Sequence, residues 1–258
     1  NPSTGKRYDP SEALARETLF VGASKECLAE EQRRLIELGI YPLRLEISSI
    51  SLFAGLKRAV VEEDMDGSVL IVEFSENSPE EALQKANTLR EEFIKNNYGY
   101  HFPIVSGNDI SRVWDLRKAG LGLLSNIPGD AKPVPVIEDT AVAVEDLPEY
   151  ISEFNLILKK YDLYCVHYAH AGSGELHLRP IINLKTAYGQ KLFRTILDEI
   201  SGLVKKYRGS LSGEHGDGRL RAEFIRKMIG DENYNLLRKV KSSWDPNNIF
   251  NPGKIVDA

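Results

Sequence analysis

The sequence predicts an α+β fold in which helices cover a mostly antiparallel sheet. Apolar segments of strand length alternate along the chain with longer segments whose apolar residues recur at helical spacing. Two strand-like segments also follow each other directly around Gly172-Ser-Gly174, which indicates a hairpin. Strands mixed with helices and a hairpin favour the α+β class. Both halves of the chain show a β-α-β type of order, which is compatible with a split βαβ sheet and an internal repeat.

The first half is expected to hold three strands and three helices. The strands are expected at 19–22, 41–47 and 68–74, and the helices at 25–38, 48–61 and 78–96. The last of these helices has the clearest start, because Ser78 suits the N-cap, Pro79 the first helical position and two acidic residues the first turn.

The second half is expected to repeat this mixture. A short strand and a helix fall between 103 and 125, a Pro/Gly loop at 126–135, a strand at 134–143, a helix at 146–161, two strands at 163–171 and 175–182, a helix at 186–207, and two more helices within 219–243. Glycines dominate the segment 209–218, which is therefore expected to be a loop.

Composition excludes several classes of protein. The 258 residues carry a formal net charge of −5 without a Lys/Arg block, which argues against a nucleic-acid surface. No apolar run approaches the ~18 residues of a membrane-spanning helix. Cys27 and Cys165 are isolated, so they predict neither a disulfide framework nor a cysteine zinc site. We expect reduced thiols in a cytoplasmic protein.

The beginning of the chain is polar and rich in turn residues. Residue 1 is Asn, and no signal-peptide pattern follows it. We expect residues 1–18 to be a linker, residues 19–258 to form one domain, and the whole chain to be a piece of a longer protein.

Histidines cluster in the predicted hairpin. Four of the five lie between 167 and 215. If Ser173 and Gly174 form a two-residue loop, His170 faces His177 directly, with Cβ atoms about 4.5–5.5 Å apart. Two imidazoles at that separation can share one metal ion. The alternative is a solvated hairpin face that carries unrelated histidines.

Strand alternation assigns the remaining hairpin residues to two faces. Tyr168 and Arg179 share the face of the two histidines. The opposite face is apolar and consists of Ala169, Ala171, Leu176 and Leu178. His167 falls on that apolar face, where we expect a hydrogen-bonded core histidine.

A second cluster, Ser212-Gly-Glu-His-Gly-Asp-Gly-Arg219, surrounds titratable groups with glycines. Glu214 can add a carboxylate to the two imidazoles and so complete a two-histidine, one-carboxylate metal site. The adjacent His215 suits a general base near neutral pH. An ordinary glycine-rich connector is the alternative. The segment matches neither the phosphate-binding loop of nucleoside triphosphatases nor the dinucleotide-binding fingerprint.

Three motifs in this order carry a family resemblance: His170-Ala-Gly-Ser-Gly-Glu-Leu-His177, Ser212-Gly-Glu-His-Gly-Asp-Gly218 and Asn251-Pro-Gly-Lys254. Together they resemble the C-terminal domain of FAD-linked oxidases, the group that includes D-lactate, glycolate and D-2-hydroxyglutarate dehydrogenases. Pro133-Val-Pro-Val-Ile-Glu-Asp-Thr140 is most similar to large bacterial members that join this unit to an iron–sulfur domain. The resemblance is good over 100–258 and weak over 19–100.

The resemblance implies a ferredoxin-like cap beside a separate flavin-binding domain. His170, His177 and Glu214 match the residues that hold a divalent metal, usually zinc, and His215 matches the catalytic base.

Other positions match groups that bind substrate or cofactor. Arg117 matches an arginine that grips the substrate carboxylate, and Lys132 lies near a second basic substrate group. Arg179 stands where many members have Asn, which suggests a second anionic group on the substrate or pairing with a local carboxylate such as Glu175. Asn251 and Lys254 lead back toward the flavin domain and are expected to bind the cofactor.

The expected activity is oxidation of a small D-2-hydroxy acid to a 2-oxo acid by hydride transfer to FAD. The flavin domain is expected upstream in the same chain, so the isolated chain should bind no FAD and turn over nothing. Two other classes remain open: a metal- or ligand-binding module without chemistry, and a zinc metallohydrolase.

Overall fold

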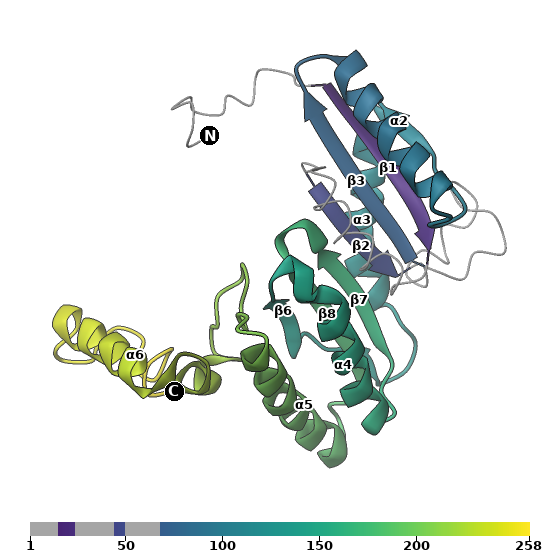
Figure 1. The fold of residues 1–258 in the computed structure, drawn as a ribbon. Coiled ribbons are helices and arrows are strands. Elements are labelled where there is room, and N and C mark those ends of the chain that lie inside the picture. The colour runs from purple at the N-terminus through teal and green to yellow at the C-terminus, as the bar shows by residue number, and fades with distance from the viewer. Residues whose placement is uncertain (1–14, 24–43, 50–67) are drawn as a thin grey trace.

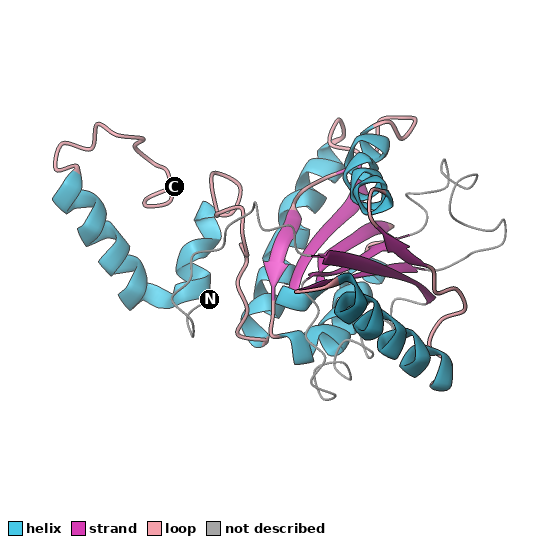
Figure 2. Cartoon of the chain, turned by 90° about the horizontal axis from the view of Figure 1, so that it is seen from above, coloured by secondary structure: helices cyan, strands magenta, loops and turns pink. Residues whose placement is uncertain are grey.

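A computed structural model describes residues 15–23, 44–49 and 68–258 (Figure 1). The described chain forms one eight-stranded sheet whose strand pairs are antiparallel, and helices lie on both of its faces (Figure 2). The predicted α+β class and antiparallel sheet are confirmed. The helix expected at 25–38 lies outside the described residues. So does the helix expected at 48–61, except that its first two residues belong to a strand.

The described residues of the first half form four strands and a helix: β1 (Ala15–Ala23), β2 (Arg44–Ser49), β3 (Ser68–Glu76), α2 (Pro79–Lys95) and β4 (Ile104–Ser106). Their order in the sheet is β4-β1-β3-β2. Strand β1 begins at Ala15, inside the segment expected to be a linker. Helix α2 begins as predicted, because the Ser78 side chain accepts a hydrogen bond from the Glu81 amide.

The second half repeats this plan with β6 (Ile137–Ala141), α4 (Leu147–Lys160), β7 (Cys165–His170), β8 (Glu175–Ile182) and α5 (Ala187–Lys206). Ser210 then bridges to Ala141 at the outer side of β6. The pairing order is therefore Ser210-β6-β8-β7, which matches β4-β1-β3-β2 of the first half. This is the ferredoxin-like order that the resemblance implied.

The two halves join through a short pairing of β2 with β7, in which Ile47 lies opposite Ala169 and Ser48 opposite Tyr168. The two-residue strand β5 (Lys132–Pro133) adds to β8. One sheet therefore carries both repeats.

The main core lies on one face of this sheet. Helices α2, α4 and α5 pack their apolar sides there against alternate residues of β3 and β8, such as Leu70, Val72, Leu176 and Leu178. Helix α3 (Asp109–Ser125) covers the other face. Its first turns pack on Val69 and Ile71, and its end packs on Val166 and Tyr168.

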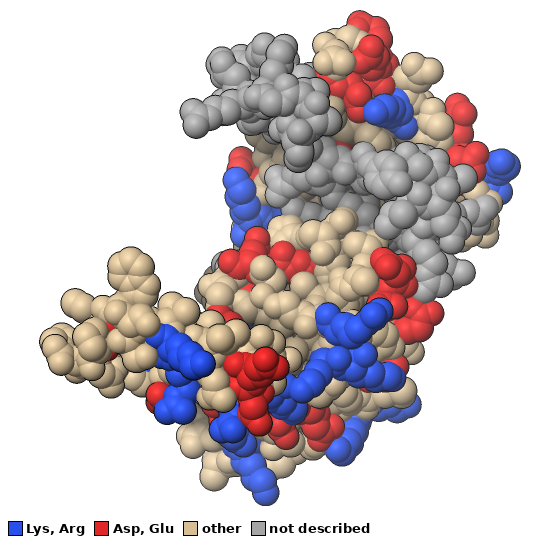
Figure 3. Space-filling model, turned by 60° about the vertical axis from the view of Figure 1, so that its left-hand side comes forward, with Lys and Arg blue, Asp and Glu red and all other residues tan. Residues whose placement is uncertain are grey.

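The last helix, α6 (Ala222–Trp244), projects away from the sheet (Figure 1). Gly230 interrupts it with a φ of 81°, so the two helices expected in this region are confirmed. No helix among the described residues is long and apolar enough to cross a membrane. On the face seen in Figure 3, Lys and Arg side chains are interspersed with Asp and Glu.

Candidate functional site

The hairpin β7–β8 differs from its predicted register. Residues 171–173 form a 3-10 turn, and Gly174 follows with a φ of 74°. The loop therefore has four residues instead of two, and His170 lies opposite Glu175 while His177 lies opposite Tyr168. Gly174 is required there, because a Cβ atom would lie 2.0 Å from the carbonyl oxygen of Val142. The predicted direct opposition of His170 and His177 is wrong.

The predicted assignment of hairpin residues to two faces is still correct, because a register shift of two residues leaves every side chain on the same side of the sheet. Ala169, Ala171, Leu176 and Leu178 all belong to the main core. His167 lies among them and is confirmed as a hydrogen-bonded core histidine. Its Nδ1 lies 3.0 Å from the carbonyl oxygen of Cys165, and its Nε2 lies 3.2 Å from Asn155 Oδ1.

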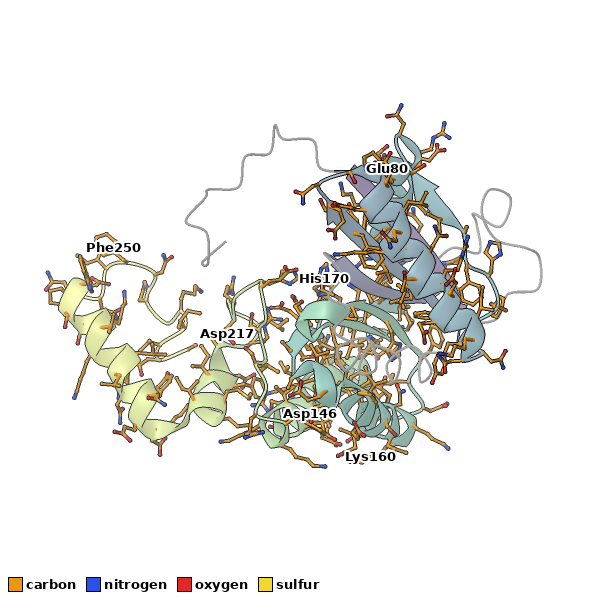
Figure 4. The ribbon with its side chains drawn as sticks, turned by 45° about the horizontal axis from the view of Figure 1, so that its top comes forward. Glu80, Asp146, Lys160, His170, Asp217 and Phe250 are labelled. Carbon is orange, nitrogen blue, oxygen red and sulfur yellow. The ribbon has the colours of Figure 1, made fainter. Side chains whose placement is uncertain are left out.

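Three imidazoles meet on the opposite face. The rings of His170 and His177 have centroids 4.9 Å apart and are nearly perpendicular, so the pair still meets along the diagonal of the hairpin. The glycine-rich loop 209–218 brings His215 onto His177, with stacked rings 5.3 Å apart. Figure 4 shows His170 at the end of its strand and Asp217 on the neighbouring loop.

Glu214 lies at the centre of these rings. Its Oε1 atom is 3.7 Å from His170 Nε2, 3.6 Å from His177 Nε2 and 3.4 Å from His215 Nε2. Donor atoms of His170, His177 and Glu214 all lie within 4.8 Å of one another. Two imidazoles and a carboxylate suit Zn²⁺ and related divalent ions, so the residues present fit the predicted metal.

Glu138, His177 and His215 form a second set whose donor atoms lie within 4.8 Å of one another. This set shares His177 with the first. Glu138 Oε1 lies 4.0 Å from Nδ1 of His177, on the other side of that ring from Glu214. His177 therefore has a carboxylate beside each of its nitrogens.

Burial sets the charge of this cluster. Burial, together with the neighbouring His170 and His215, lowers the pKa of His177 to about 4. His177 is therefore neutral near neutral pH, which is the form that binds metals. Burial, a hydrogen bond to Asp139 and the nearby Glu214 raise the pKa of Glu175 to about 7. Burial opposes ionisation of Asp139, but bonds from Ser212 and two backbone amides still lower its pKa to about 2.

Arg117 approaches the same face from α3. Its guanidinium lies over the ring of Tyr168, 4.6 Å from the centroid, and its charge helps to lower the pKa of His177. Tyr168 lies directly opposite His177 in the hairpin. Tyr168 thus lies between the predicted substrate arginine, Arg117, and the predicted metal ligand His177.

The other predicted substrate groups have local partners. Arg179 Nη2 lies 2.5 Å from Glu138 Oε1, so it pairs with a carboxylate, although Glu138 takes the place expected of Glu175. Lys132 Nζ donates to the carbonyl oxygen of Ile127 at 2.5 Å.

Asn251 and Lys254 lie in the exposed tail after α6. Figure 4 shows the neighbouring Phe250 at the far end of α6, away from His170. The described chain therefore does not bring these two residues to the imidazole cluster.

Glu138 and Asp139 are not among the residues that the sequence singles out, and Glu175 is named there only as a partner of Arg179. The first two lie in the family-like segment that ends at Thr140, which was the available signal. Nothing local to that segment shows that it contacts residues 212–215.

Comparisons with known proteins identify the family. Residues 21–255 match the family described as FAD linked oxidases, C-terminal domain. The D-2-hydroxyglutarate dehydrogenase of Haemophilus influenzae is 38% identical over 200 residues, which cover 75% of this chain and 19% of that protein. The D-2-hydroxyglutarate dehydrogenase of Escherichia coli is 42% identical over 146 residues, or 57% of this chain and 14% of that protein.

A solved structure supports the fold. The 4-ethylphenol oxidase of Gulosibacter chungangensis aligns with a TM-score of 0.67 at 13% identity, covering 96% of this chain and 55% of that one. The chain spans about a fifth or less of the two curated relatives. With almost its whole length matched, this chain belongs to the family of FAD-linked oxidase C-terminal domains.

Proposed function

We propose that this chain is the substrate-binding part of a flavin-dependent dehydrogenase that oxidises a D-2-hydroxy acid to a 2-oxo acid. The convergence of His170, His177 and His215 on Glu214, in a chain of the FAD-linked oxidase family, carries the proposal. FAD would accept the hydride from C2 of the substrate.

His170, His177 and Glu214 are the proposed ligands of a divalent metal, with zinc as the first candidate. Bound there, the ion would act as a Lewis acid on the substrate carboxylate and hydroxyl. The neutral His177 supports this assignment, since no proton has to leave it before a metal binds.

His215 is the proposed base that takes the hydroxyl proton. Its ring stacks on His177, and its Nε2 lies 3.4 Å from Glu214, so it borders the proposed metal position. The side chain is 45% exposed, which lets the proton pass on to solvent.

Arg117 is the proposed partner of the substrate carboxylate. A guanidinium recognises a carboxylate through two parallel hydrogen bonds, and stacking on Tyr168 restricts its orientation. Arg179 and Lys132 remain proposed contacts of a second anionic group. A dicarboxylate such as 2-hydroxyglutarate would have to compete with Glu138 for Arg179.

The flavin-binding domain is the proposed partner of α6 and the tail. Large apolar side chains are exposed there: Leu236, Val240, Trp244, Ile249 and Phe250. An exposed apolar patch of this kind is typical of an interaction surface. Asn251 and Lys254 lie within it, which supports their proposed role near the cofactor.

Metal analysis tests the metal part of this proposal. The chain purified without chelator should carry zinc or manganese, whereas His170→Ala and Glu214→Ala should carry little. The exposed His101 of the first half provides the control, and His101→Ala should match the wild type. Equal metal content in all four proteins would contradict the assignment.

A screen of D-2-hydroxy acids with an artificial electron acceptor tests the reaction in the complete flavin-containing protein. Oxidation of one acid class supports the dehydrogenase. Zinc-dependent ester hydrolysis by the chain alone would favour a metallohydrolase, and metal binding without either reaction would favour a binding module.

A further inference from the structure

Asp139 is an unusual residue for a strand. Its side chain is completely buried, and its φ is 82°, a conformation that residues other than glycine seldom adopt. It lies where the register of β6 against β8 shifts, between Glu138 and Thr140. Bulges beside functional sites commonly aim a side chain.

The Asp139 carboxylate binds the loop that carries the predicted ligand and base. Its Oδ1 accepts the Glu214 amide at 2.8 Å, and its Oδ2 accepts the His215 amide at 3.0 Å and the Ser212 hydroxyl at 2.6 Å. Its backbone carbonyl accepts the Gly213 amide at 2.7 Å. One residue thus holds four consecutive residues of the loop.

Arg221 completes this anchor from the far side of the loop. Its buried guanidinium donates to the carbonyl oxygens of Glu138 at 2.5 Å and Gly216 at 2.7 Å. It also lies 3.5 Å from Asp139 Oδ2, so it balances the buried negative charge.

The side chains of Glu214 and His215 lack comparable support of their own. They are 49% and 45% exposed, and their closest charged neighbours lie 3.4 Å away or farther. Their position over the imidazoles therefore depends on the backbone to which they are attached.

We propose that Asp139 is the positioning residue of this site, which fixes the backbone of Glu214 and His215 so that both side chains stay over His170 and His177. This inference rests on the proposed function for its consequence in metal binding, but the backbone contacts exist without a metal.

Two substitutions isolate the carboxylate. Asp139→Asn keeps the shape and tolerates a positive φ, but it replaces one acceptor oxygen by an NH₂ group that cannot accept an amide proton. Asp139→Gly also tolerates this φ and removes every bond of the carboxylate to the loop.

Thr140→Val is the matched control. Thr140 is the next residue of β6 and is equally buried, and its hydroxyl accepts a hydrogen bond from Tyr150 in the main core. This variant loses a buried hydrogen bond of the same strand without touching the loop.

Zn²⁺ titration of the 258-residue chain gives the first measurement. Loss of a group that orients a metal ligand typically weakens metal affinity about 10- to 100-fold, and we expect this for Asp139→Asn and Asp139→Gly. Thr140→Val should bind Zn²⁺ like the wild type even though it unfolds at a lower temperature. If Thr140→Val loses as much affinity as Asp139→Asn, the role is merely structural and the inference is overturned.

Amide hydrogen exchange of the metal-free chain gives the second measurement. The amides of Glu214 and His215 should exchange at least about tenfold faster in Asp139→Asn, while those of β8 stay unchanged. This readout separates the two proposals. If the wild type binds no Zn²⁺, the metal assignment fails and exchange alone decides on Asp139. If Asp139→Asn leaves both Zn²⁺ affinity and exchange at wild-type values, Asp139 has no positioning role.

Discussion

The two halves of the sheet have the same strand order but use the face beneath α3 differently. In the first half, β3 presents Val69 and Ile71, and the first turns of α3 cover them. In the second half, the corresponding strand β8 presents Glu175, His177 and Arg179, and the glycine-rich loop approaches them instead of a helix. A helix thus covers the apolar residues Val69 and Ile71 of β3, whereas the equivalent face of β8 carries polar side chains.

The difference has an energetic consequence. Apolar side chains beneath a helix stabilise the fold by leaving water. Buried polar side chains do so only when they find partners, and in the second half Glu138 pairs with Arg179 while Asp139 accepts the Glu214 amide. Substitutions on the two faces test how completely these two roles are separated.

The largest effect is expected on turnover. His215→Ala in the flavin-containing protein should lower kcat by about 10²- to 10⁴-fold, because the proposed proton acceptor is lost. His101→Ala in the first half should leave kcat within about twofold. Steady-state kinetics with the best 2-hydroxy acid measures both, and a near-wild-type His215→Ala would remove the proposed base.

Core truncation should affect both halves alike. Leu70 on β3 and Leu178 on β8 are fully buried in the shared core. Leu70→Ala and Leu178→Ala should each lower the free energy of unfolding by about 2–5 kcal/mol, as measured by urea titration. Separate unfolding transitions for the two variants would show that the halves do not share one cooperative core.

Exchanging the two faces should have unequal effects. Ile71→His buries an imidazole among apolar side chains and should lower the free energy of unfolding by about 2–4 kcal/mol. His177→Leu removes a buried neutral imidazole and should change stability by less than about 1.5 kcal/mol, while metal binding disappears. A large stability loss in His177→Leu would show that the histidine is structural.

The helix caps should show the smallest and most similar effects. Ser78 caps α2 and Thr186 caps the corresponding helix α5, each by accepting an amide hydrogen bond three residues on. Ser78→Ala and Thr186→Ala should each lower the free energy of unfolding by about 0.5–2 kcal/mol in urea titrations. Unequal costs would show that one half depends more on its helix than the other.

Much of this architecture follows from the sequence alone. The helix starts at Ser78 and Thr186 depend on neighbouring residues, and alternation along β7 and β8 separates the histidines from the apolar face whatever the register. The alternation therefore predicts His167 in the core, and the structure places it there. Helix starts and strand faces can be predicted from the sequence because they depend on residues only a few positions apart.

Only the tertiary structure decided how the site is assembled. The hairpin loop has four residues instead of two, and its Gly174 passes close to Val142 in a distant part of the chain. Arg179 pairs with Glu138 instead of Glu175. Asp139 holds residues more than 70 positions away, at 212–215. The sequence by itself determined on which face of the hairpin the histidines and the apolar residues lie. Their register and supports come from long-range packing, which no local pattern records.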